Sequence, residues 1–230
     1  MLVILAVLAW TAPHGEVSTG KFFPNEYNRG GWAYFQVGAR VLQFKGFGLV
    51  LGGWTQVWTK RGQGVIQFAP WRSDYCGYAG VSWQDWQFAL EHTCFHSVDT
   101  FVERSLYWNC LRLSWQHDKG PLWARLSGAF YINDKDQYWL SKGADYANDI
   151  TVDAEFQPVK PLFVRFWNFT GIGLNYRRFH IGTELDAGVA WVEENRTRLR
   201  FFVGVRPYDH KEHRNVQAWL AGLRYSFDFR

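Results

Sequence analysis

The stretch that decides the fold lies near the end of the chain, where residues 219–229 read WLAGLRYSFDF. Every second residue from Trp219 to Phe229 is apolar, and polar residues such as Arg224 and Asp228 lie between them. Apolar side chains at every second position are typical of a β-strand with one apolar and one polar face. The segment therefore predicts a strand that runs almost to the end of the chain.

The same alternation continues upstream and predicts an all-β chain. Apolar residues in 199–205 alternate with charged residues such as Arg200, and those in 179–191 alternate with residues such as Glu184. The composition agrees, since 19% of the 230 residues are aromatic, 14 are Trp and 22 are Gly. Many aromatics and glycines with scattered charge fit an all-β protein with an aromatic surface better than a helical protein.

We predict a single domain at residues 16–230 that forms an antiparallel transmembrane β-barrel of about twelve strands. The strands are expected at 31–44, 47–59, 64–71, 76–83, 86–96, 105–116, 121–131, 149–157, 161–177, 179–192, 197–207 and 215–229. The longer connections, at 97–104, 132–148 and 208–214, fall on one side of this barrel, and the short ones fall on the other. Short turns on one side and longer loops on the other are typical of membrane-spanning barrels.

The N-terminus predicts export from the cytoplasm. The apolar run from Leu2 to Trp10 is shorter than the roughly 20 residues that span a bilayer as a helix, but it has the length of a signal-peptide core. Small residues follow, so we expect a signal peptide at residues 1–15, with cleavage near Ala12 or Gly15. No later apolar run is long enough for a transmembrane helix, so a membrane would have to be crossed by strands.

Three features favour a membrane barrel over a soluble β-sandwich: the export signal, the aromatics near strand ends, and the aromatic last strand. We therefore predict location in the outer membrane of a Gram-negative bacterium. The expected partners are membrane lipid and the outer-membrane insertion machinery. The net charge of +4 is unclustered, and no run of Lys or Arg indicates binding to nucleic acid.

Residues 90–99, LEHTCFHSVD, carry the strongest candidate site. On a strand, His92, Cys94 and His96 share a face with lipid-side residues such as Leu90, whereas Glu91 and its odd-numbered neighbours point to the other face. If the following loop closes a hairpin, positions summing to about 201 lie opposite one another. His92 then faces Asn109, and directly opposed residues have Cβ atoms roughly 4.5–5.5 Å apart. The amide of Asn109 would be close enough to orient the imidazole.

These residues resemble outer-membrane phospholipase A, over His92-x-Cys94 and Trp108-Asn109. The resemblance implies a twelve-stranded barrel that hydrolyses lipid esters. It also implies that His92 is the general base, that Cys94 is the nucleophile and that Asn109 orients the imidazole ring. This sequence departs from the family in two ways, because cysteine stands in place of the nucleophilic serine and the gap from histidine to asparagine is longer.

A second resemblance covers more of the chain. An uncharacterised family of bacterial outer-membrane proteins carries a strand motif close to His-x-Ser-Ser-His-x-Gly-Asp, which is similar to the segment from His92 to Asp99. Residues 109–131 and 222–229 also look like that family. This resemblance implies a barrel and supplies no activity.

Other interpretations of the same residues stay open. His92 and His96, with Asp99 as a further ligand and Cys94 beside them, have the side chains to bind a metal ion. Alternatively, they only mark the interfacial end of a barrel strand. No pattern in the sequence identifies a cofactor.

Three classes of function follow from these observations. We predict first a structural or surface-interaction barrel. A lipid ester hydrolase that uses His92, Cys94 and Asn109 is the alternative, and a small pore or transporter is the second alternative. The arginines and carboxylates on the polar face are expected to form a paired charge network that fills the barrel. These residues are Arg198, Arg200, Arg206, Arg224, Glu184 and Asp186.

Overall fold

Twelve strands make up the part of the chain that the structure describes. The computed structural model describes residues 13–23, 30–59, 70–97, 106–132, 146–173, 179–192, 197–209 and 218–228. The strands are β1 (His14–Phe23), β2 (Gly31–Phe44), β3 (Phe47–Thr59), β4 (Pro70–Trp83), β5 (Trp86–Ser97), β6 (Leu106–Lys119), β7 (Leu122–Ile132), β8 (Tyr146–Val159), β9 (Leu162–Gly173), β10 (Phe179–Val192), β11 (Arg198–Asp209) and β12 (Ala218–Asp228). Within these ranges the structure contains no helix that is long and apolar enough to cross a membrane.

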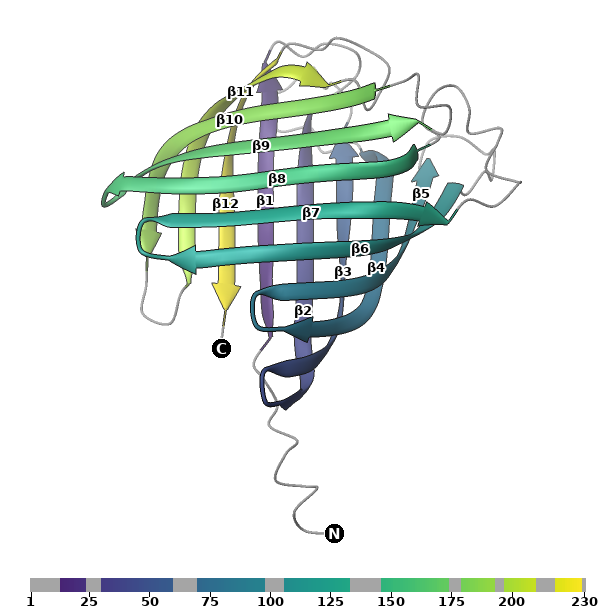
Figure 1. The fold of residues 1–230 in the computed structure, drawn as a ribbon. Coiled ribbons are helices and arrows are strands. Elements are labelled where there is room, and N and C mark those ends of the chain that lie inside the picture. The colour runs from purple at the N-terminus through teal and green to yellow at the C-terminus, as the bar shows by residue number, and fades with distance from the viewer. Residues whose placement is uncertain are drawn as a thin grey trace.

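Each strand pairs antiparallel with its neighbours in the chain, and the first strand closes the barrel against the last (Figure 1). In this closure His14 lies opposite Asp228, and the pairing continues to Phe23 opposite Trp219. Closure gives every strand two hydrogen-bonded partners, so no open sheet edge is left. The predicted all-β antiparallel barrel is confirmed.

The predicted number of strands is correct because two errors cancel: one strand is missed, and another is divided into two. The prediction misses β1, which reads HGEVSTGKFF and has only a few large apolar residues to reveal its alternation. It also divides β4 into 64–71 and 76–83, although the structure has one strand from Pro70 to Trp83. The expected break contains Asp74, whose carboxylate accepts a hydrogen bond from Trp58 Nε1 at 3.2 Å. A polar residue that points into the barrel does not interrupt the strand.

Some of the predictions fall on residues that the structure does not describe. These are positions 64–69 of a predicted strand, 105 of the predicted strand 105–116, 174–177 of the predicted strand 161–177, 215–217 and 229 of the predicted strand 215–229, and 1–12 of the predicted signal peptide. The signal peptide therefore stays a prediction. Because β1 begins at His14, only cleavage near Ala12 would leave this strand whole.

The two ends of the barrel differ. The turns 45–46, 84–85, 120–121 and 160–161 lie at one end, together with the start of β1 and the end of β12 (Figure 1). We call this the short-turn end. The longer intervals between strands, such as those after β3, β5 and β7, join strand ends at the opposite end, which we call the long-connection end. The predicted segregation of short and long connections is confirmed.

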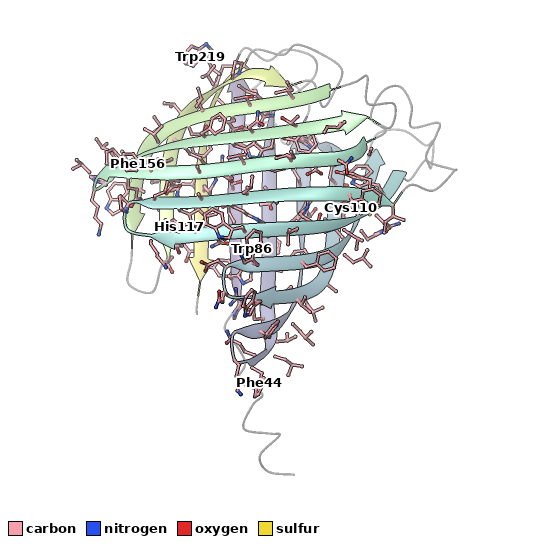
Figure 2. The ribbon with its side chains drawn as sticks, viewed as in Figure 1. Phe44, Trp86, Cys110, His117, Phe156 and Trp219 are labelled. Carbon is pink, nitrogen blue, oxygen red and sulfur yellow. The ribbon has the colours of Figure 1, made fainter. Side chains whose placement is uncertain are left out.

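The outer wall of the barrel is apolar. Large hydrophobic side chains stand outside the ribbon, and Figure 2 labels four of them: Phe44, Trp86, Phe156 and Trp219. Phe44 and Trp219 are 61% and 66% exposed. Leaving so much apolar surface in water would cost about 25 cal/mol per Å², whereas the outer wall of a membrane barrel is in contact with lipid. The outer wall is therefore the lipid-facing surface.

Aromatic rings gather on this outer wall at the short-turn end. Phe44 and Phe47 flank one turn, and Trp83 and Trp86 flank the next. The Phe47 and Trp83 rings stack with their centroids 5.8 Å apart. Aromatic girdles of this kind lie where a membrane barrel crosses the boundary between hydrocarbon and water.

Charged and aromatic side chains project into the lumen. Near the long-connection end, two clusters of buried side chains occupy it. One contains Phe22, Trp32 and Trp58, and the other contains Tyr131 and Phe169. The Phe22 ring lies 4.9 Å from that of Trp32, between centroids. Charged residues that also point into the lumen are described below with the candidate sites.

Candidate functional site

The hairpin formed by β5 and β6 has the predicted register. His92 lies opposite Asn109, and Cys94 lies opposite Tyr107. The pairing runs without interruption from Trp86 to Phe95. The expected facing is also confirmed, because His92 is exposed on the outer wall whereas Thr93 is buried on the lumenal side.

His92 and Asn109 are joined by a hydrogen bond across the hairpin, with 2.8 Å between His92 Nδ1 and Asn109 Oδ1. An amide oxygen only accepts hydrogen bonds, so Nδ1 donates in this contact and carries the proton. In the neutral ring the basic nitrogen is then Nε2. Asn109 therefore fixes both the orientation and the tautomer of the imidazole.

Cys94 lies on the same outer face, two residues further toward the long-connection end. Side chains at i and i+2 on a strand point to the same side and are separated by about 7 Å along it. Cys94 is a free thiol of intermediate exposure, whereas Cys76 and Cys110 are buried on the lumenal side. Of these three cysteines, Cys94 is the one that an outside molecule can reach from the lipid.

A charged network lies on the lumenal side, directly behind the His92–Asn109 pair. Arg112 of β6 holds Glu91 of β5 at 2.7 Å, from Nε to Oε2. Its two terminal nitrogens hold the carboxylate of Asp149 of β8 at 2.8 and 3.0 Å. Tyr131 of β7 donates a hydrogen bond of 2.6 Å to the same carboxylate. Four consecutive strands are thus tied together behind the site by charge-assisted hydrogen bonds.

Sequence reasoning placed Glu91 in the lumen but did not single out Arg112, Tyr131 or Asp149. The available signal was the alternation of Arg112 with the apolar residues on either side, which identifies it as lumenal. Its partner on β8 could not be found that way, because the two residues are 37 positions apart.

The predicted charge network in the lumen is confirmed. Each of its four arginines pairs with a carboxylate: Arg198 with Asp118 and Glu155, Arg200 with Glu155, Arg206 with Glu184, and Arg224 with Glu16 and Asp186. Arg165 was not singled out, yet it contacts Asp153, Glu184 and Asp186 at 2.7 to 3.2 Å. The predicted arginines are thus engaged in ion pairs within the barrel.

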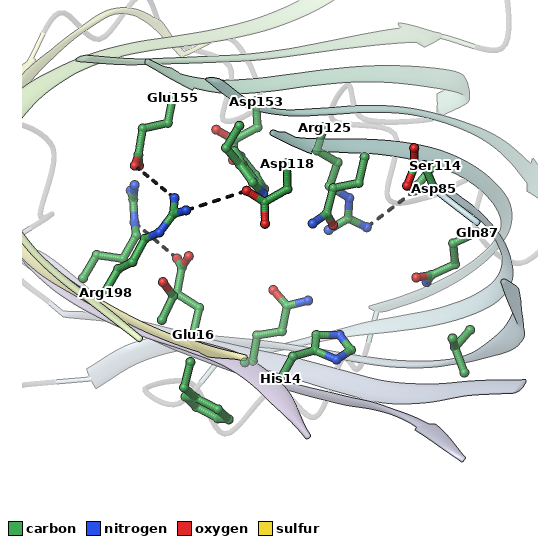
Figure 3. Close-up of a pocket in the computed structure, with 18 of the residues that line it drawn as sticks. His14, Glu16, Asp85, Gln87, Ser114, Asp118, Arg125, Asp153, Glu155 and Arg198 are labelled. Atoms are coloured by element: carbon green, nitrogen blue, oxygen red, sulfur yellow. Dashed lines mark hydrogen bonds and ion pairs between the residues drawn. The ribbon is translucent and has the colours of Figure 1, made fainter. Parts of the chain in front are cut away.

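A cavity of about 420 Å³ lies in the lumen at the short-turn end (Figure 3). Its wall includes the ion pairs of Arg198 with Glu155 and Asp118, and the hydrogen bond of 3.5 Å from Arg125 to Ser114. The cavity is polar and lined by charges of both signs. It lies on the opposite side of the β-sheet wall from His92.

The predicted metal site depends mostly on residues that lie outside the part of the chain that the structure describes. The side chain of His96 and the whole of Asp99 are among them. Within the described part of the chain, no group of three or more His, Cys, Asp or Glu side chains is placed to hold a metal ion. The predicted ligand set of His92, His96 and Asp99 therefore stays a prediction.

Comparison with known proteins gives a likeness of fold. No family profile matches the chain, and no curated protein matches its sequence. Outer membrane phospholipase A from Escherichia coli is similar in structure, with a TM-score of 0.54 and 11% identity over 98% of this chain and 97% of that one. A structure of the same enzyme with an active-site asparagine replaced by alanine gives a TM-score of 0.53, with 11% identity over 96% of this chain and 91% of that one. The Salmonella typhi outer membrane phospholipase, a dimer with bound calcium, gives a TM-score of 0.52, with 11% identity over 94% of this chain and 90% of that one.

The chain has the fold of an outer-membrane β-barrel. The predicted location in the bacterial outer membrane agrees with this fold and with the exposed apolar outer wall. The resemblance to an uncharacterised outer-membrane family stays a prediction, since no family profile matches.

Proposed function

We propose that this protein hydrolyses lipid esters from the lipid-facing wall of the barrel, with Cys94 as nucleophile, His92 as general base and Asn109 as the residue that orients the imidazole. The observation that carries the proposal is the 2.8 Å hydrogen bond between His92 and Asn109 on the outer wall. Polar side chains on a membrane-facing surface are costly, and those that occur there commonly serve a function.

The position of the site suits a lipid substrate. His92 lies on the same face as apolar residues such as Leu90, which is 51% exposed. Cys94 lies beyond it toward the long-connection end, which in membrane barrels is the outer side. A lipid ester at the outer-leaflet boundary can approach Cys94 sideways from the membrane without entering the lumen.

The chemistry proceeds in two balanced steps. His92 Nε2 takes the proton of the Cys94 thiol, and the thiolate attacks the ester carbonyl carbon. The ester C–O bond breaks, the imidazolium returns its proton to the leaving alcohol, and an acyl-thioester remains on Cys94. Water, deprotonated by His92, then attacks the thioester; the fatty acid leaves and the thiol is restored. The same set of Cys, His and Asn serves papain-like proteases on an unrelated fold.

The likeness to outer membrane phospholipase A supports this choice. That protein is a phospholipase by name, and an asparagine belongs to its active site. In this chain Asn109 is the asparagine bonded to the histidine. The cysteine in place of serine keeps a nucleophile at the position that the resemblance assigns to one.

The lumen gives less support to a pore. Its predicted arginines are paired with carboxylates, and aromatic clusters occupy the described lumen near the long-connection end. A structural or surface-interaction barrel is the alternative that remains if no hydrolysis is found.

The test is phospholipid hydrolysis by the purified protein, refolded in detergent and then in vesicles. Wild type should release fatty acid, and Cys94→Ala and His92→Ala should each lower kcat by at least about 1,000-fold. Cys76→Ala is the matched control, because Cys76 is a buried cysteine on the lumenal side of the neighbouring strand, and it should keep full activity. Activity that survives both site substitutions, or no activity in wild type, would rule out the proposal.

A further inference from the structure

On the outer wall beside His92, the next two strands each carry a glycine on the same rung, so neither has a side chain there. In the register of the sheet, His92 of β5 lies opposite Gly77 of β4, and Gly77 lies opposite Gly53 of β3. Gly77 alternates with the buried lumenal residue Cys76, so Gly77 and the paired Gly53 belong to the outer face. Strands are about 4.8 Å apart, so the side-chain-free strip extends roughly 10 Å from His92 along the wall.

The strip is open at one position and closed at the other. A Cβ added to Gly77 would meet no atom within 4 Å. A Cβ added to Gly53 would lie 2.6 Å from the carbonyl oxygen of Cys76, so that position has no room for a side chain. Gly77 is thus a place where the chain omits a side chain that the backbone would permit.

Apolar side chains border the strip on both sides. Leu51 and Leu90 lie one step toward the short-turn end, and Tyr75 lies one step toward the long-connection end. Their exposed fractions are 49%, 51% and 44%. We call the strip Gly53–Gly77, with these three flanking residues, the glycine notch. It is a stretch of exposed backbone bordered by apolar side chains, and it ends at His92.

We propose that the glycine notch holds the acyl chain of the lipid whose ester is cleaved, and that Gly77 makes the site specific for long acyl chains. This inference rests on the proposed hydrolase function. The occupant is membrane lipid because the notch lies on the wall that faces the bilayer, where the open space above Gly77 is filled by hydrocarbon. A chain lying in the notch places its carboxyl end beside His92 and Cys94.

The chain offers a matched control at Gly128 of β7. This glycine also faces outward, and a Cβ there would meet only the carbonyl oxygen of Asp149, at an ordinary 3.6 Å. Its rung contains Leu113 and Ile150 and does not contain His92. A leucine at either glycine adds the same apolar volume to the lipid-facing wall, but only the one at position 77 fills the notch.

The experiment compares wild type, Gly77→Leu and Gly128→Leu, each shown to be folded by heat-modifiable migration. The substrates are dipalmitoyl phosphatidylcholine and p-nitrophenyl butyrate. Gly77→Leu should lose about tenfold in kcat/KM on the long-chain lipid, the effect of displacing about two methylenes from an apolar contact. It should stay within about twofold of wild type on the short ester, which does not reach the notch. Gly128→Leu should match wild type on both.

Equal losses on both substrates, or no loss on the lipid, overturn the acyl-chain assignment while wild-type activity still supports the hydrolase.

A second measurement needs no hydrolysis. Phosphatidylcholine with a photoreactive group in its acyl chain should label the peptide containing Gly77 in wild type and label it much less in Gly77→Leu. If the label at that peptide is the same in both proteins, the notch is not an acyl-chain site, whether or not the protein hydrolyses lipid.

Discussion

Arg112 of β6 donates two parallel hydrogen bonds to the carboxylate of Asp149 of β8, 2.8 Å from Nη1 to Oδ1 and 3.0 Å from Nη2 to Oδ2. The same guanidinium holds Glu91 of β5 through its third nitrogen. This single side chain therefore fixes the lumenal side of the hairpin whose outer side carries His92 and Asn109. The candidate site and the charge network thus lie on opposite faces of the same hairpin, on neighbouring rungs.

Arg112→Leu should destabilise the barrel. It leaves the carboxylates of Glu91 and Asp149 without their cation in a buried setting, which costs about 3 kcal/mol or more. Urea unfolding in vesicles measures the loss. Arg125→Leu is the matched control, because the hydrogen bond from Arg125 to Ser114 is long, at 3.5 Å, and its loss should cost less than about 1 kcal/mol. Equal losses in the two variants would contradict the special role of Arg112.

Asn109→Ala should slow catalysis without abolishing substrate binding. Loss of a partner that orients a functional imidazole costs about 10- to 100-fold in activity, and we expect this loss in kcat with KM nearly unchanged. Asn168→Ala is the control, since Asn168 also stands on the outer wall and donates a 3.0 Å hydrogen bond to Thr183 Oγ1. A fall of kcat in both variants, or a rise in KM with kcat unchanged, would show that Asn109 has no orienting role.

The candidate hairpin was predictable from sequence because both of its constraints are local. The alternation around His92 sets the facing, and a single loop length sets the register that places Asn109 opposite. The partners of Arg112 and Arg165 were not predictable, because they depend on how distant strands are brought together by closure of the barrel. The strand β1 was missed for a related reason: its alternation is weak, and its pairing with β12 spans nearly the whole chain.

The glycine notch also lay beyond sequence reasoning. A glycine inside a strand indicates a bulge, a bend or a close approach of backbone, and Gly77 is none of these. Its significance comes from its neighbours across two strands, Gly53 and His92. Only the three-strand register shows that the two glycines form a continuous strip ending at the histidine.

Purified protein in a planar bilayer should give no stepwise ion conductance. The described lumen holds paired arginines and carboxylates, and Phe22, Trp32 and Trp58 pack together in it near the long-connection end. Charged groups already neutralised by partners do not draw ions through a narrow barrel. A porin reconstituted in the same bilayer is the positive control. Reproducible conductance steps from this protein would favour the pore hypothesis over the hydrolase.

Closure of the barrel by β1 predicts a specific crosslink. Thr19 lies opposite Leu223 across the β1–β12 seam, so cysteines at the two positions should form a disulfide on mild oxidation, because directly opposed Cβ atoms are roughly 4.5–5.5 Å apart.

The pair Lys21→Cys with Tyr225→Cys is the control, since Lys21 pairs with Ala221 and the two cysteines would lie about 13 Å apart along the strands. Both pairs are made with Cys76, Cys94 and Cys110 replaced by serine. Nonreducing gels should show a circularised, faster-migrating band for the first pair alone. Its absence, or an equal yield from the control pair, would mean that His14–Phe23 is not the strand that closes the barrel.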